Sequence, residues 1–274
     1  MPKPPRVVIL IHRHGSFSEP LYFLHEIADV WREEGIEVVV HQGPQSPVEA
    51  DLAINHVDLT VVPADHLAYL RQYPVVLNRA VVDISKRMIS CHLVSFGDGY
   101  EGPVIVKADR NCSGWREAEL AKKGLLPATY LTVVPEYRVF DSPSHVPEGL
   151  WQRRELVIER FLPERIGEHY GLRTWVFLGD KETNSLSYAT EPIIKQRGVI
   201  RREPVEEVPR KLREIREELG FDFGKFDYGI VEGEVVLYDA NRTPGLGTFP
   251  KEQYMPRIRI YAKGLASFLS SHAK

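Results

Sequence analysis

The sequence has few cysteines. Only Cys91 and Cys112 occur among 274 residues, and they do not form a C-x-x-C pair. Two thiols cannot build the disulfide framework of small secreted proteins, and they are typical of a reducing compartment. We therefore expect both cysteines to be reduced thiols.

Long apolar runs are also missing. The apolar segment Val7–Ile11 is too short for a signal peptide and ends at His12-Arg13-His14. No stretch approaches the ~20 apolar residues that a membrane-spanning helix requires. The sequence thus predicts no membrane partner and a cytoplasmic location.

Neither sign of charge is in large excess. The chain has 35 Lys and Arg against 38 Asp and Glu, a formal net charge of −3. This balance gives no electrostatic reason to expect nucleic acid as a partner, although it leaves room for a local basic cleft. Hydrophobic residues make up 43% of the chain and charged residues 27%, as in ordinary globular proteins.

Several nucleotide and metal motifs are absent or incomplete. No Walker A sequence occurs. Gly97-x-Gly99-x-x-Gly102 has the letters of a dinucleotide fingerprint, but Pro103 and an apolar strand follow it instead of a helix. The motif therefore favours a flexible turn over an oxidoreductase site. His12 and His14 form only an isolated H-x-H pair, which favours solvated side chains over a metal site.

The first part of the chain reads as alternating strands and helices. A buried strand is predicted at Val7–Ile11, a helix at Glu19–Glu34 ending at Gly35, and a strand at Ile36–Val40. Further short apolar segments follow at Leu52–Ile54, Thr60–Val62 and Val75–Leu77. This alternation predicts an α/β layer of Rossmann-like type, and we place a domain boundary between residues 88 and 89.

After the boundary the pattern changes to α+β. Short strands are predicted, several of them antiparallel, together with a helix at Arg116–Lys123, a charged amphipathic helix at Val205–Leu219 and a closing helix at Tyr254–Leu269. The predicted strands are Val104–Val106, Leu156–Ile158, Thr174–Leu178, Ser187–Ala189, Asp227–Val231 and Val235–Tyr238. The last two are joined by a tight turn at Glu232–Glu234. Residues 127–150 are predicted to form a loop or lid.

The C-terminal hairpin carries oxygen donors. Asp227 lies on one strand, and Asp239 and Asn241 end the next. Residues two apart on a strand face the same side, so the three side chains can converge on one patch. Mg²⁺ prefers such oxygen ligands together with phosphate oxygens. The alternative is a polar hairpin face with an Asn-containing turn.

Charged residues also end three other predicted elements. Lys107 closes an apolar strand before the polar turn Arg110–Gly114, whose backbone N–H groups can cover phosphates. Glu159 ends the next strand, and Arg173 begins the one after it, where a guanidinium can bind phosphate in bidentate fashion. Each has a plain alternative, as a snorkelling lysine or a charged strand end at the surface.

Taken together, the order of these residues resembles the ATP-grasp superfamily, and most closely its carboxylate–amine ligases, such as ribosomal-protein glutamate ligase and glutathione synthetase. The resemblance covers about residues 75–250 and rests on Lys86, Lys107, Glu159-x-Phe161, Arg173, Asp227 and Asp239-x-Asn241-x-x-Pro244-Gly245. It implies a Rossmann-like pre-ATP-grasp domain at 1–88 and an ATP-grasp domain of two α+β subdomains at 89–274. The sequence departs from the family in its shorter glycine-containing loop and in having Asp239 where Glu is common.

The resemblance also implies a role for each matching residue. Arg173 and Lys107 would stabilise the transferring phosphoryl group, and Mg²⁺ would bind to Asp227, Asp239 and Asn241. ATP would be bound by Lys86, Lys107, Glu159, Arg160, Phe161, Leu162 and Lys195. The implied reaction joins a small-molecule carboxylate to an amine or thiol through an acyl phosphate, with amino acids or peptide-like compounds as substrates. The alternatives are an ATP-grasp kinase and a non-catalytic nucleotide-binding protein, and a homodimer is expected from base rates alone.

Overall fold

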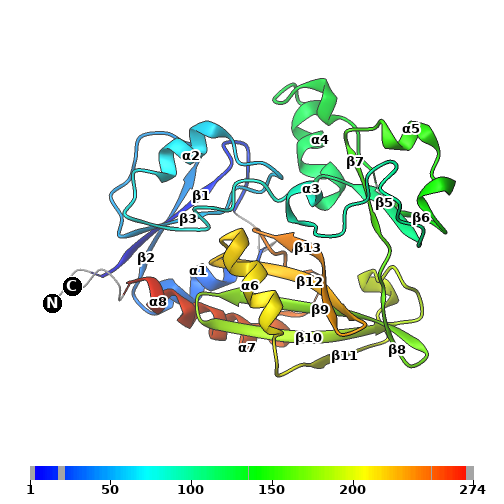
Figure 1. Ribbon diagram of the computed structural model, residues 1–274. Helices are drawn as coiled ribbons and strands as arrows, with labels where there is room; N and C mark the ends of the chain where they lie inside the picture. The colour runs from blue at the N-terminus through cyan, green and yellow to red at the C-terminus, as the bar shows by residue number, and fades with distance from the viewer. Residues whose placement is uncertain (1–3, 18–21, 135, 248, 270–274) are drawn as a thin grey trace.

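The computed structural model describes residues 4–17, 22–134, 136–247 and 249–269, which form three β-sheets with flanking helices (Figure 1). Within these ranges no helix has the length and apolar character needed to cross a membrane. The fold is therefore mixed α/β, as predicted.

The first sheet is parallel and has the strand order β2-β1-β3-β4. It consists of β1 (Arg6–Ile11), β2 (Glu37–Gln42), β3 (Leu52–Asn55) and β4 (Val75–Leu77), with helices α1 (Phe23–Glu33) and α2 (Ala64–Leu70). The central strand β1 is buried on both faces, which explains its unbroken apolar sequence. The predicted strand positions are confirmed, whereas Thr60–Val62 forms only an isolated bridge from Val61 to Asp83. The predicted start of the first helix falls at residues 18–21, outside the described ranges.

The second sheet is antiparallel, in the order β6-β5-β7. It contains β5 (Val104–Ala108), β6 (Arg138–Phe140) and β7 (Leu156–Arg160), and the helices α3 (Lys86–Ile89), α4 (Trp115–Lys122) and α5 (Glu148–Trp151) accompany it. Residues 127–150 were predicted to form a loop or lid; within this segment β6 pairs with β5, and short helical turns form on either side of it. Backbone pairing, which leaves little trace in the sequence, orders this segment.

The third and largest sheet has the order β11-β10-β9-β12-β13, with β8 paired to β9. Its strands are β8 (Glu164–Ile166), β9 (His169–Leu178), β10 (Lys181–Ala189), β11 (Arg201–Pro204), β12 (Phe223–Val231) and β13 (Glu234–Asn241). One face is covered by α6 (Arg210–Leu219), which begins five residues later than predicted because Pro209 occupies its N-cap position. The β12–β13 hairpin is confirmed, with left-handed backbone at Glu232 and Gly233.

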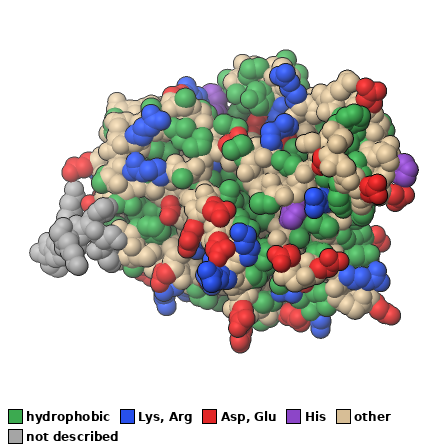
Figure 2. All heavy atoms as spheres, in the orientation of Figure 1, with side chains coloured by type: hydrophobic (Ala, Val, Ile, Leu, Met, Phe, Trp, Pro, Cys, Tyr) green, Lys and Arg blue, Asp and Glu red, His purple; other side chains and the backbone are tan. Residues whose placement is uncertain are grey.

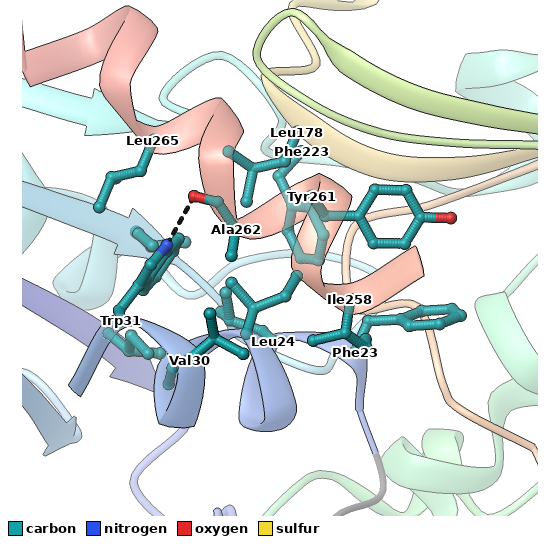
Figure 3. Close-up of a cluster of buried hydrophobic side chains, with 14 of the residues drawn as sticks. Phe23, Leu24, Val30, Trp31, Leu178, Phe223, Ile258, Tyr261, Ala262 and Leu265 are labelled. Carbon is teal, nitrogen blue, oxygen red and sulfur yellow. Dashed lines mark hydrogen bonds between the residues drawn. The ribbon is translucent and has the colours of Figure 1, made fainter. Parts of the chain in front are cut away.

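A long helix near the C-terminus packs against the first helix of the chain. α7 (Lys251–Ala262), followed by a helical turn and α8 (Ala266–Leu269), lies along α1 (Figure 3). Leu24, Ile258 and Tyr261 are fully buried there, and the Trp31 indole N–H donates to the Ala262 carbonyl at 2.8 Å. This core joins the parallel sheet to the C-terminal segment, and the proposed division at residue 88 stays a prediction.

Replacing Leu24 with Ala tests this contact. We expect the free energy of unfolding to fall by about 3 kcal/mol, because the substitution leaves a cavity between two helices that cannot easily close around it. Met88→Ala is the matched control, since Met88 is 60% exposed. Urea denaturation measures both variants, and a loss below about 1 kcal/mol for Leu24→Ala would contradict the packing described here.

Candidate active site

A cavity of about 200 Å³ lies between the three-stranded sheet and the large sheet. Strands β5 and β7 form one wall, and β9, β12 and β13 form the other. Seven residues singled out in the sequence line this cleft: Lys107, Glu159, Arg160, Phe161, Leu162, Asp227 and Asp239. Residues that lie far apart in the chain, and that the resemblance assigns to ATP and Mg²⁺ binding, therefore meet at one cavity.

Lysines and carboxylates are paired in this cleft. The Lys86 Nζ lies 2.5 Å from Asp239 Oδ1, and the Lys107 Nζ lies 2.8 Å from Glu159 Oε2. Lys86, Lys107 and Glu159 are each about 95% buried. Buried charges need partners, so each lysine is held at the cleft by a carboxylate.

These pairings shift the pKa values of the buried groups. Burial alone would raise the pKa of Asp239, but nearby Lys86, Lys225 and Lys107 outweigh it and lower that pKa. Burial opposes the charged form of Lys86 as well, yet the Asp239 carboxylate raises its pKa. Burial dominates at Glu159, whose pKa is raised although Lys107 opposes the shift. The Asp239 end of the cleft thus keeps its charges at neutral pH.

The three predicted metal ligands lie on the same face of the large sheet. Asp227 is directly opposite Asp239, and Asn241 is opposite Lys225. A β-bulge between Asp227 and Tyr228 shifts the alternation of β13, so that the adjacent residues Tyr238 and Asp239 both line the cleft. The bulge is the feature that turns Asp239 toward Asp227.

The chemistry of this donor set fits Mg²⁺ bound together with a triphosphate. Mg²⁺ usually takes one or two carboxylates from a protein and completes its octahedron with water and phosphate oxygens. Here the donors are two carboxylates and one amide. Consistent with that small number, no three His, Cys, Asp or Glu side chains in the described part of the chain form a group suited to a metal.

The opposite end of the cleft is formed by the segment that leaves β7. The backbone N–H groups of Arg160 and Phe161 are already used, because they donate to the carbonyls of His92 and Pro103. The Tyr238 hydroxyl donates to the Leu162 carbonyl at 2.7 Å. The backbone donors of Arg160 and Phe161 and the Leu162 carbonyl are therefore already paired, and adenine binding by this segment stays a prediction.

Solved structures provide the comparison. No family model and no curated protein matches the sequence. A RimK domain ATP-grasp protein from Sphaerobacter thermophilus is similar over 96% of this chain and 99% of its own, with a TM-score of 0.53 and 14% identity. The D-alanine–D-alanine ligase of Bacillus anthracis is similar over 97% and 96%, with a TM-score of 0.52 and 12% identity. The ATP-grasp ligase PsnB, solved with a phosphomimetic variant of its minimal precursor, Mg and ADP, is similar over 99% of both chains, with a TM-score of 0.56 and 13% identity.

The chain has the ATP-grasp fold. The resemblance read from the sequence is confirmed at this level. At 12–14% identity the similarity establishes the fold and leaves the reaction to be argued from the site.

Four predicted residues do not line the cleft. Lys86 adjoins it through its pair with Asp239, Asn241 lies two residues beyond Asp239 on β13, and Arg173 and Lys195 lie apart from it. Arg173 lies on the other face of β9, where its guanidinium binds the Glu164 carboxylate at 2.8–3.0 Å. Alternate residues of a strand face opposite sides. On β9, the residues before and after Arg173 are Leu172 and Thr174, and these line the cleft or the cavity next to it. The structure therefore does not support a phosphate role for Arg173. Lys195 lies in a separate shallow cavity beside the cleft.

Other cations occupy the place that Arg173 was expected to take. Lys225, two residues before Asp227 on β12, contacts that carboxylate at 2.7 Å. A neighbouring cavity shares Leu172, Ile194 and Asp227 with the cleft and is lined by Lys225, Arg202 and Arg257. The period of two along β12 could have identified Lys225. The two arginines come from distant segments, and nothing in the sequence pointed to them.

The turn after β5 has an unusual backbone. Cys112, Ser113 and Gly114 have φ values of 46°, 58° and 78°, so three consecutive residues are left-handed. This conformation costs about 1 kcal/mol for each residue other than glycine. A strained turn directly after the strand of Lys107 agrees with the prediction that Arg110–Gly114 covers phosphates, which stays a prediction.

Replacing Ser113 with Gly should relieve part of that strain. We expect the free energy of unfolding to rise by roughly 0.5–1 kcal/mol, because glycine adopts positive φ without a Cβ clash. Thermal unfolding followed by circular dichroism measures the change. Ser144→Gly is the control, since Ser144 is exposed and its backbone φ is negative; a lower midpoint for Ser113→Gly than for this control would contradict the assignment.

Replacing Arg173 with Met tests its position on the far face. Glu164 is only 4% exposed and would lose its positively charged partner. We therefore expect the free energy of unfolding to fall by about 3 kcal/mol. Nucleotide affinity, measured by isothermal titration calorimetry below the unfolding temperature, should be unchanged. A tenfold or greater loss of nucleotide affinity, roughly 1.4 kcal/mol of binding free energy, would show that Arg173 belongs to the nucleotide site.

Proposed function

We propose that this protein is an ATP- and Mg²⁺-dependent ligase that activates a carboxylate as an acyl phosphate and joins it to an amine. The observation that carries the proposal is the cleft of an ATP-grasp fold in which Lys86, Lys107 and Lys225 surround Asp227 and Asp239. Cations matched to phosphate oxygens and carboxylates matched to Mg²⁺ are what phosphoryl transfer requires.

In this proposal the residues act mainly by position and charge. Lys86 and Lys107 exchange their carboxylate partners for phosphate oxygens of ATP. Asp227, Asp239 and Asn241 hold Mg²⁺, which when bound neutralises charge on the transferring phosphoryl group. Leu162 and its neighbours border the purine.

The neighbouring cavity supports a carboxylate as the activated group. Burial, and after it the charge of nearby Arg257, lowers the pKa of Arg202. An anion between them would relieve that repulsion. In the first step a carboxylate oxygen bonds to the γ-phosphorus and ADP leaves. In the second, the amine nitrogen bonds to the acyl carbon, phosphate leaves with the electron pair of the broken C–O bond, and the amine loses a proton.

Solved relatives of the same fold are consistent with this chemistry. PsnB was solved with Mg and ADP, and the Bacillus anthracis protein is named for joining D-alanine to D-alanine. Because these proteins share only 12–13% identity with this chain, their substrates are not carried over.

Replacing Asp239 with Asn tests the proposal. We expect ADP formation to fall at least about 100-fold, because the metal loses one of two carboxylates. The assay couples ADP release to a screen of carboxylates and amines with Mg²⁺, and Asp141→Asn on an exposed position is the control. Undiminished turnover in a folded Asp239→Asn protein would overturn the metal assignment.

The same screen separates the alternatives. ADP formation that requires an added amine supports the ligase. A phosphorylated product without an amine would identify a kinase. Nucleotide binding without any turnover would identify a non-catalytic binding protein.

A further inference from the structure

The side chain of Tyr238 connects the two walls of the cleft. Its hydroxyl donates to the Leu162 carbonyl at 2.7 Å and accepts from the Glu164 backbone N–H at 3.2 Å. Leu162 follows β7 of the three-stranded sheet, Glu164 begins β8 of the large sheet, and Pro163 between them has no N–H to donate. One hydroxyl therefore fixes the peptide segment 162–164, which crosses from one sheet to the other.

A β-bulge brings this side chain to the cleft. Asp227 is opposite Asp239 and Tyr228 is opposite Leu237, so Tyr238 is the extra residue of β13 at the bulge. Bulges next to functional sites commonly re-aim a side chain. Here the bulge lets the Tyr238 ring line the cleft together with Asp239, the residue that follows it.

The adjacent strand leaves room for the Tyr238 ring. A Cβ atom at Gly229 on β12 would lie too close to the Tyr238 hydroxyl, and only 3.0 Å from the ring carbon Cε2. Glycine within a strand often marks such a close approach. The bulge and Gly229 therefore act together to place one hydroxyl against the segment 162–164.

The backbone of Tyr238 makes a different contact. Its carbonyl accepts a hydrogen bond from Lys107 Nζ at 3.1 Å, and the same Nζ pairs with the Glu159 carboxylate. Burial raises the pKa of Tyr238, so its hydroxyl remains protonated at neutral pH and can donate to Leu162. The carbonyl thus contacts a lysine assigned to phosphate, whereas the hydroxyl contacts the segment assigned to the purine. Loss of the hydroxyl should therefore affect only the purine end of the cleft.

We infer that Tyr238 is a positioning residue for recognition of the nucleotide base, because its hydroxyl holds residues 162–164 in place before the nucleotide binds. This inference rests on the proposed function. A segment that is already ordered loses less conformational freedom when a ligand arrives, and the saving increases affinity. The phosphates are bound by the lysines without the help of this hydroxyl.

Tyr238→Phe tests the inference, because it removes the hydroxyl and keeps the ring. ADP and pyrophosphate are titrated by calorimetry into the full chain with Mg²⁺, since pyrophosphate carries phosphates without a base. We expect the affinity for ADP to fall about tenfold and the affinity for pyrophosphate to change by less than about twofold. Tyr254→Phe is the matched control. It removes another buried hydroxyl, which donates to Glu26 at 3.1 Å, and should change neither affinity.

Gly229→Ala is a second variant that acts on the same hydroxyl. The new Cβ would displace the Tyr238 hydroxyl from the segment 162–164, so we expect the same selective loss of ADP affinity. Gly149→Ala is its control, because a Cβ there has no other atom within 4 Å among the described residues. Circular dichroism confirms that each variant is folded before the titrations.

The outcomes separate this inference from the proposed function. Unchanged ADP affinity in a folded Tyr238→Phe protein overturns the inference and leaves the ligase proposal standing. Equal losses of ADP and pyrophosphate affinity overturn it too, because the hydroxyl would then support the whole cleft. A selective loss of ADP affinity, in a protein that forms no ADP with any pair of carboxylate and amine, supports the role of Tyr238 and contradicts the ligase proposal instead.

Discussion

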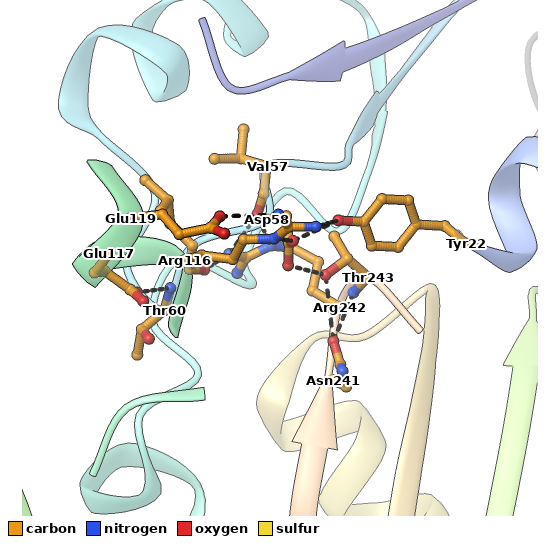
Figure 4. A network of polar contacts seen from close by, with 11 residues as sticks. Tyr22, Val57, Asp58, Thr60, Arg116, Glu117, Glu119, Asn241, Arg242 and Thr243 are labelled. Carbon is orange, nitrogen blue, oxygen red and sulfur yellow. Dashed lines mark hydrogen bonds and ion pairs between the residues drawn. The ribbon is translucent and has the colours of Figure 1, made fainter. Parts of the chain in front are cut away.

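The arrangement of the whole site depends on the buried guanidinium of Arg242. It is fully inaccessible to solvent and donates to the backbone carbonyls of Leu59 and Val81 and to that of Val57 (Arg242 and Val57 are labelled in Figure 4). Burial is the main reason that its pKa is lowered to about 10, so it remains charged at neutral pH. Through these bonds the end of β13 is fixed to the loops of the parallel sheet. This anchor positions the residues next to Arg242 in the chain. Asp239 and Asn241 precede it, and Thr243 follows it.

Charge balance is the second constraint. Three carboxylates at the cleft are paired with three lysines, as Lys86–Asp239, Lys107–Glu159 and Lys225–Asp227. Such pairs keep charged groups buried and in position at little net cost in stability. Over the face of the molecule in Figure 2, acidic and basic side chains are likewise interspersed. This face therefore carries no extended region of one charge.

Individual residues show where reading the sequence succeeds. The patterns at Val7–Ile11 and at the β12–β13 hairpin were found because burial and strand alternation repeat within a few residues. The same alternation predicted that Asp227 and Asp239 share one face, and the register of the hairpin places them opposite each other, while their role as metal ligands stays a prediction. Arg173 failed because a charged residue on a strand does not reveal which face it occupies, and the far face supplied a partner in Glu164. The strand β6 within residues 127–150 was not predicted, because it is ordered by pairing with a strand some thirty residues away.

The sequence by itself determined the alternation of elements and an ordered set of donors whose spacing resembles ATP-grasp ligases, because those features are local along the chain. Tertiary structure alone decided which donors share a cavity, through the bulge at Asp227/Tyr228 and the anchor at Arg242. It also brought the cations Arg202 and Arg257 together at one cavity. These depend on contacts between residues far apart in the chain, and a linear pattern carries no record of burial or of the partner that a side chain meets.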